Sequence, residues 1–174
     1  MGGKEVTLPI AERAGLLTRA GFAIYGSGEK VGLTSPTQRG EHVRKHILCQ
    51  EPPAIPGDPP PFPDIPDPKE KTWVEVLKEI HLKDNDNDPT TPNTCVACHE
   101  AIDPVGFAFE NYTLNGQYIN AYPNGRAIDA SGWLVSLNDG GKDYDDTTFN
   151  DALELSEILA GSDDAAACFA ETWM

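Results

Sequence analysis

A proline-rich stretch constrains the fold of this chain more than any other feature of its sequence. Nine prolines occupy the seventeen residues 52–68. Proline has a fixed φ and lacks a backbone N–H, so the stretch excludes helix and favours an extended polyproline conformation. We expect a stiff strap that wraps its own domain, and a ligand for an aromatic-lined groove is the alternative. Regular secondary structure must therefore come from the sequence on either side.

Hydrophobic spacing and capping residues predict helices on both sides of the proline-rich stretch. Ser35 is a favoured N-cap, and Pro36 suits the first helical position. The expected helices cover residues 10–25, 35–49, 71–82, 149–160 and 163–173. A turn at 122–125 precedes a small hairpin or three-strand patch over 127–137. The predicted fold class is therefore mainly α with a small antiparallel β element.

The charge of the chain excludes several classes of partner. Asp and Glu number 28 against 13 Lys and Arg, which gives a formal charge of −15. Such a chain repels phosphate backbones and anionic lipid, so binding to nucleic acid or a membrane surface is not expected. No apolar run approaches the ~18 residues of a membrane span. Because the first residues lack the apolar segment of a signal peptide, we expect a processed or excised piece of a longer protein.

Two of the four cysteines stand in the motif Cys95-Val-Ala-Cys98-His99. Cys-x-x-Cys-His is the attachment signature of c-type haem. The thiols form thioethers to the two vinyl groups of one porphyrin, and the histidine donates an imidazole nitrogen to the iron. A redox dithiol would need a preceding strand and a following helix, and zinc would need further ligands that do not follow. We therefore predict one covalent haem c, with those two sites as alternatives.

Cys49 and Cys168 are the remaining pair, 119 positions apart. Covalent haem attachment implies a compartment outside the cytoplasm, where leftover thiols tend to oxidise. A disulfide between these two residues is the expectation, and two buried free thiols are the alternative. The predicted location is periplasmic or extracellular.

The segment from Cys95 to Tyr118 resembles the planctomycete-type cytochrome c region near the C-termini of large secreted bacterial proteins of uncharacterised function. The shared pattern is the haem motif, then Ile-Asp-Pro, Gly-Phe-Ala, a Glu-Asn-aromatic step and a Gly before a polar residue. Other parts agree in order, so the resemblance covers roughly residues 12–173 and is most specific over 95–112. Gln117 stands where the family often has Arg, and the spacer between His81 and the motif is longer than usual.

The resemblance implies a single monohaem domain over 1–174. Its parts would be N-terminal helices (10–51), the proline-rich strap (52–68), a haem-binding core (69–118), and a small β element with two C-terminal helices (119–174). Such a domain transfers electrons to or from a partner protein. The partner would carry a basic surface, and the domain itself would be part of a larger multidomain or multisubunit assembly. We expect an electron-transfer protein rather than an enzyme.

The second axial position of the iron decides between functions. Met or His usually fills it, but the only methionines, Met1 and Met174, stand at the ends. His81 ends the helix before the motif and is the predicted distal ligand, with an open or water-ligated site as the alternative. An open site would make a haem-based ligand-binding or peroxidase-like domain, although no distal acid–base pair is evident near the motif. His42 and His46 are four residues apart, but the nearby basic residues Arg39, Arg44 and Lys45 favour a solvated helix face.

Other residues are candidates for contact with haem. Arg126 is a candidate partner for a propionate, because buried carboxylates need a positive or hydrogen-bonding neighbour. Aromatic residues are expected to wall the porphyrin, with ordinary core packing as the alternative: Phe107, Phe109, Tyr112 and Trp133.

The acidic loops invite comparison with calcium sites. Asp84, Asp86 and Asp88 alternate as in an EF-hand loop. However, Pro89 stands at the sixth position, which requires glycine, and Cys95 stands at the twelfth, which requires glutamate. In the segment that begins at Asp143, Thr148 stands where glycine is required. A solvated acidic surface is the better interpretation, and a loose Ca²⁺ site is the alternative.

Overall fold

The computed structural model describes residues 7–25, 34–52, 71–82, 94–137 and 147–173, and every structural statement below refers to these. The predicted strap lies outside them except for Pro52. The acidic loop residues 84–88 and 143–146 also lie outside them, so the calcium comparison stays a prediction.

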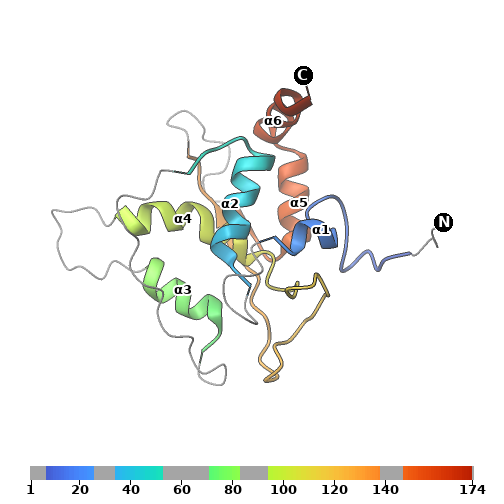
Figure 1. Cartoon of the computed structure of the whole chain (residues 1–174), viewed down its shortest axis with the longest axis vertical. Coiled ribbons are helices and arrows are strands. Elements are labelled where there is room, and N and C mark those ends of the chain that lie inside the picture. Colours follow the sequence, from blue (N-terminus) through green and yellow to red (C-terminus); the bar gives the residue numbers. More distant parts are fainter. Residues whose placement is uncertain (1–6, 26–33, 53–70, 83–93, 138–146, 174) are drawn as a thin grey trace.

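The chain is mainly α, as predicted, with one two-stranded antiparallel sheet (Figure 1). The helices are α1 (Ala20–Ala23), α2 (Pro36–Ile47), α3 (Trp73–His81), α4 (Thr94–Phe107), α5 (Ala152–Ala160) and α6 (Asp163–Trp173). The strands are β1 (Gly132–Leu134) and β2 (Thr147–Phe149).

The pairing of β1 corrects the sequence-based expectation. β1 pairs with β2, and Gly132 lies opposite Phe149, so the sheet is not a hairpin within 127–137. Residues 147–149 therefore form a strand, although Phe149 was expected to begin a helix. The helix begins three residues later because Asp151 caps it, accepting hydrogen bonds from the backbone N–H groups of Leu153 and Glu154.

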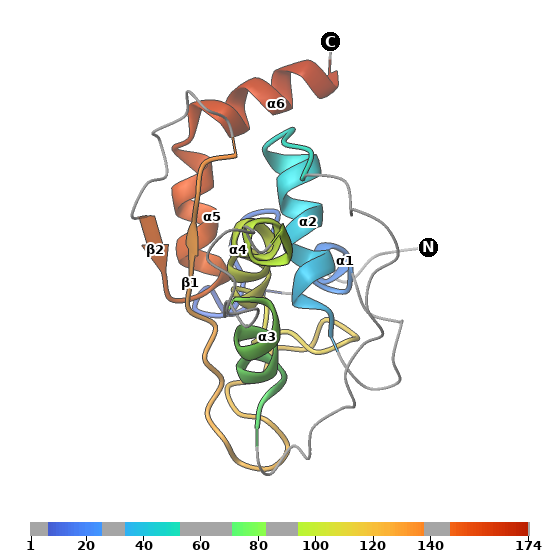
Figure 2. The same ribbon diagram turned by 90° about the vertical axis from the view of Figure 1, so that its left-hand side faces the viewer.

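Helices α2 and α4 form the most extensive helix pair of the described fold, and α4 also packs on α3 and β1 (Figure 2). Two glycines let the backbones of α2 and α4 meet. A Cβ on Gly40 would lie 1.8 Å from the carbonyl oxygen of Ile102, and one on Gly106 would lie 1.8 Å from that of Pro36. No larger residue fits at either position without moving backbone, so this crossing fixes α4 against α2.

The main hydrophobic cluster surrounds this crossing. Its thirteen buried members are Leu17, Ala23, Val43, Leu48, Val105, Ala108, Phe109, Tyr112, Leu134, Phe149, Ala152, Leu155 and Leu159. They come from both ends of the chain, so α5 and the sheet close over the same core that α2 and α4 begin.

Two arginines of α2 are buried, which corrects the predicted solvated face. Arg39 is 2% exposed and Arg44 is 0% exposed. The Arg39 guanidinium donates to the backbone carbonyls of Tyr25, Ala23, Phe109 and Tyr112. Such donors satisfy carbonyl groups that would otherwise be buried without partners. A pattern of charged residues does not reveal this use of arginine.

The expected helix over 10–25 is wrong, because only Ala20–Ala23 is helical. Gly15 takes a φ of +68°, outside the helical region. The Thr18 hydroxyl accepts from the backbone N–H of Ala14 and donates to its carbonyl. Side-chain bonds of this kind compete with helix formation.

Helix α3 belongs to a second and smaller cluster. Thr72 and Glu75 form a capping box at its start. The buried members of this second cluster are Val74 and Leu77 of α3 and Phe107 of α4. α3 and α6 lie at opposite ends of the molecule (Figure 2).

The predicted disulfide between Cys49 and Cys168 is present. It joins Cys49, two residues beyond the C-terminal end of α2, to α6, across a sequence separation of 119. Among the described residues, no helix combines the length and apolar character that crossing a bilayer requires.

Candidate functional site

The cysteine motif lies on the first turns of α4. This helix runs from Thr94 through Asp103-Pro104 to Phe107. No helix was proposed here from the sequence. Pro104 cannot donate to the carbonyl of Glu100 and usually ends or kinks a helix, yet α4 continues through it. The side chain of Cys95 lies outside the description. Cys98 is a free, half-buried thiol.

His99 follows Cys98 and is held by a carboxylate one turn further along α4. Its side chain is 23% exposed. The Nδ1 atom lies 3.1 and 3.2 Å from the two carboxylate oxygens of Asp103. An ionised carboxylate only accepts hydrogen bonds, so the Nδ1 of His99 donates. The other ring nitrogen, Nε2, is then the one with a lone pair for a metal.

His81 reaches the same carboxylate from the end of α3. Its Nδ1 lies 2.7 Å from Oδ2 of Asp103. The rings of His81 and His99 stack with their centroids 3.6 Å apart and an angle of 25° between their planes. Two imidazoles that bind one iron from opposite faces need the thickness of a porphyrin between them, which this stack does not provide. His81 as the distal ligand therefore stays a prediction, and it requires α3 to separate from α4.

Asp103 lies at the centre of this arrangement and is fully buried, with 0% of its side chain exposed. Burial would raise the pKa of the carboxyl, but the hydrogen bonds and charges of His81 and His99 outweigh burial and hold the pKa below its ordinary value. The hydroxyl of Thr37 on α2 donates to Oδ1 at 2.7 Å. Among the described residues, His81, His99 and Asp103 form a group that could hold a metal ion.

Sequence reasoning missed Asp103 as a site residue. Its spacing of four residues from His99 is the signal that could have found it, because side chains four apart share a helix face. That signal depends on knowing that the motif is helical. No helix was proposed over the motif, so this contact was missed.

The four aromatic candidates differ in position. Phe107 lies in the second cluster with Val74 and Leu77. Phe109 and Tyr112 lie in the main cluster, and Trp133 is half-buried on β1. In this structure the first three therefore pack as core, which was the alternative stated for them, and contact with haem stays a prediction.

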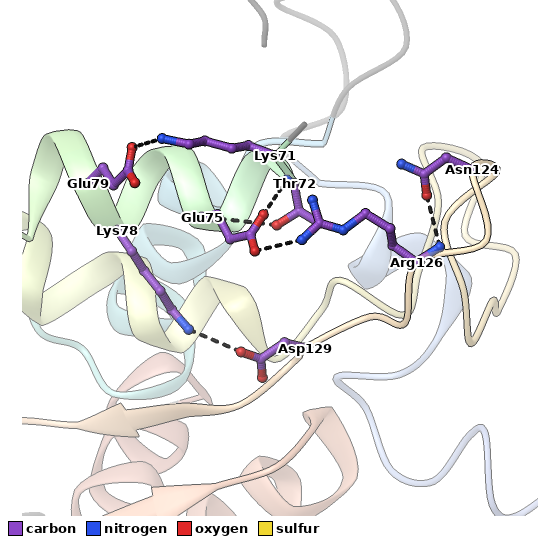
Figure 3. Close-up of polar contacts among 8 residues, drawn as sticks. All are labelled: Lys71, Thr72, Glu75, Lys78, Glu79, Asn124, Arg126 and Asp129. Atoms are coloured by element: carbon purple, nitrogen blue, oxygen red, sulfur yellow. Dashed lines mark hydrogen bonds and ion pairs between the residues drawn. The ribbon is translucent and has the colours of Figure 1, made fainter. Parts of the chain in front are cut away.

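Arg126 lies against α3 rather than in the core. Its guanidinium donates to a carboxylate oxygen of Glu75 at 2.7 Å (Figure 3). Lys78 of α3 pairs with Asp129 of the same loop at 3.2 Å. These two ion pairs attach α3 to the loop around residues 121–131. A role of Arg126 toward a propionate stays a prediction.

The two histidines of α2 belong to a different cluster. The ring of His42 stacks on Tyr25 with centroids 3.8 Å apart, and His46 lies 4.5 Å from His42 between ring centroids. Burial, followed by the nearby His46, lowers the pKa of His42. His42 is therefore a packed residue, and the exposed His46 suits a control substitution.

A protein-family model matches residues 13–122, which is more than half of the chain. The matched part includes α1 to α4 and the whole cysteine motif. The chain belongs to the PSCyt3 family. PSCyt3 is described as a protein of unknown function (DUF1588), so membership suggests a cytochrome by name and assigns no activity. The match ends at Tyr122. The expected resemblance reaches residue 173, so the family model supports it only over residues 13–122. No curated protein and no solved structure matches the chain.

Proposed function

We propose that this chain is a c-type cytochrome domain that carries one covalent haem and passes electrons to or from a partner protein. Cys95 and Cys98 would hold the porphyrin through thioethers, and His99 would bind the iron. The group, when bound, supplies a reversible one-electron Fe(III)/Fe(II) couple. We place the domain outside the cytoplasm, where c-type haem and the disulfide between Cys49 and Cys168 are both stable.

The observation that carries the proposal is that a free thiol, Cys98, stands next to a histidine, His99, whose Nδ1 is bound to a carboxylate. They are consecutive, partly buried residues of α4, and the thiol is free. The Nδ1 of His99 is bound to a buried carboxylate, which leaves Nε2 as the ligand atom. A metal-binding histidine is commonly oriented in this way by a carboxylate on its other nitrogen. The donor set therefore fits the iron of a c-type haem.

The charge of the chain supports a basic redox partner. At −15 the chain has a strongly negative field, which speeds encounter with positively charged surfaces and weakens as salt rises. Electron transfer to such a partner should therefore slow with increasing ionic strength.

Covalent attachment is the first test. Protein exported through a c-type maturation system should retain one haem per chain after acid–acetone extraction. The double variant Cys95→Ala, Cys98→Ala should lose it. The matched control, Cys49→Ala with Cys168→Ala, removes the other two cysteines and should keep it. Haem that is extracted from the wild type, or stoichiometric zinc in its place, would overturn the proposal.

The stack of His81 on His99 favours a second candidate, a haem-based ligand-binding or peroxidase-like domain with an open distal position. If His81 binds the iron, both oxidation states should be low-spin, and His81→Ala should make the reduced protein bind carbon monoxide. If the position is open, the wild type should already bind carbon monoxide, and His81→Ala should change little. His46→Ala is the control and should alter neither result.

A further inference from the structure

The carboxylate of Asp103 gathers three hydrogen-bond donors from three helices. They are the Nδ1 of His99 on α4, the Nδ1 of His81 on α3 and the hydroxyl of Thr37 on α2. The α2–α4 crossing buries the carboxylate completely, so water does not compete for its oxygens. Asp103 therefore lies in the most extensive helix contact among the described residues.

A buried carboxylate bound to the Nδ1–H of an imidazole has two effects on that ring. It fixes the tautomer and the ring orientation, and it makes Nε2 a stronger donor to a metal. A stronger donor stabilises the oxidised iron more than the reduced iron. The effect is larger in a buried setting, because screening by water is weak there.

We propose that Asp103 is a positioning residue for the axial histidine: it holds the Nε2 of His99 toward the iron and lowers the reduction potential of the haem. This inference rests on the proposed function, because it assumes that His99 is the axial ligand. The same carboxylate holds His81, so Asp103 also ties the end of α3 to α4. Removing its charge should then affect both histidines.

The main experiment is Asp103→Asn in the haem-loaded protein, followed by redox titration. Asparagine has nearly the same shape but no charge, and its oxygen accepts more weakly. The reduction potential of the haem should rise. At a fixed applied potential, the ratio of reduced to oxidised protein should then increase on the order of tenfold. Glu157→Gln is the matched control, because it removes an exposed carboxylate of α5 outside the candidate site, and it should leave the potential unchanged. Covalent haem with an unchanged potential in Asp103→Asn would overturn the inference.

A second variant tests the same inference with the opposite sign. Thr37 donates to Oδ1, the oxygen that also accepts from His99. Thr37→Val removes this competing donor, leaves the carboxylate in place and should lower the potential. If Asp103→Asn does not fold, Thr37→Val still decides the question, and an unchanged potential would contradict the inference.

A third measurement separates this inference from the proposed function. Nitrogen NMR of the haem-free chain should show the proton of His99 on Nδ1 in the wild type and a loss of that preference in Asp103→Asn. If the wild type never binds haem, the proposed function fails while this result can still support positioning by Asp103. If haem is attached but the tautomer and the potential do not respond, the inference fails and the proposed function stands.

Discussion

The two halves of the candidate site are supported by very different amounts of structure. His99 and Asp103 lie on α4, which crosses α2 at two glycines and contributes to a cluster of thirteen buried residues. His81 lies on α3, whose cluster has three buried residues, one of them from α4. Elements with few buried contacts open at lower free energy than the rest of a protein. Separating α3 from α4 should therefore cost much less than unfolding the body formed by α2, α4 and α5.

This difference bears directly on the distal ligand. His99, which would bind the iron, and Asp103 lie on a helix that is packed into the main body. His81, which would have to move, lies on a helix with few buried contacts. Besides its hydrophobic contact, α3 is held by the hydrogen bond of His81 to Asp103 and by two ion pairs at the surface, Glu75 with Arg126 and Lys78 with Asp129. Exposed pairs of this kind contribute about 0–1 kcal/mol each. A movement of α3 would remove the His81 ring from His99 but leave the bond between His99 and Asp103 within α4 in place.

The largest effect should come from the α2–α4 crossing. Gly40→Ala would place a methyl group 1.8 Å from the Ile102 carbonyl oxygen, which is backbone and cannot rotate away. We expect a loss of about 3 kcal/mol or more in the free energy of unfolding, or failure to fold. Urea unfolding followed by circular dichroism measures it. Gly21→Ala is the control, because a Cβ there meets nothing within 4 Å and alanine favours helix. Equal stability of the two variants would show that the crossing is looser than described.

A pair of leucine substitutions tests the contrast between the two clusters. Leu155→Ala in the main cluster should lower global stability by about 2–5 kcal/mol. Leu77→Ala in the second cluster should remove hydrogen-exchange protection from α3 and change global stability by about 1 kcal/mol, because α3 can detach first. Both leucines are nearly fully buried, at 0% and 1% exposed. If Leu77→Ala destabilised the whole chain as much as Leu155→Ala, α3 would be part of the cooperative body.

The contrast also explains what could be predicted from the sequence. Helix α2 was predicted from Ser35-Pro36, and α3 from an apolar stripe, because local signals specify both. The Cys-x-x-Cys-His motif was recognised by its spacing alone, and its haem stays a prediction. The helix through Asp103-Pro104 was not predicted. Pro104 disfavours helix locally, and packing of α4 against α2, α3 and β1 outweighs that preference. The buried state of Arg39 was missed for a related reason, since its carbonyl partners come from segments far apart in the sequence.

The smallest expected effect concerns the pair of Glu75 and Arg126, and it tests how α3 is held (Figure 3). The backbone N–H of Thr72 and then the Arg126 guanidinium lower the pKa of Glu75 below its ordinary value. The carboxylate of Glu75 is therefore protonated at a higher pH in the unfolded chain than in the folded chain. The stabilisation that ionised Glu75 contributes to folding is complete above the ordinary pKa of a glutamate. It is lost as the pH falls through the lower pKa that Glu75 has in the folded chain.

Glu75→Gln isolates this charge pair, because glutamine can still accept from the Thr72 N–H and complete the capping box. We expect hydrogen-exchange protection of α3 to fall by at most about 1 kcal/mol at neutral pH, since both partners are partly exposed. The loss should shrink in 1 M salt, where screening is strong. Glu79→Gln is the matched control, because Glu79 pairs with Lys71 beside α3 rather than with the loop. An equal loss in both variants would mean that charge on α3, and not its attachment to the loop, sets the opening of this half of the site.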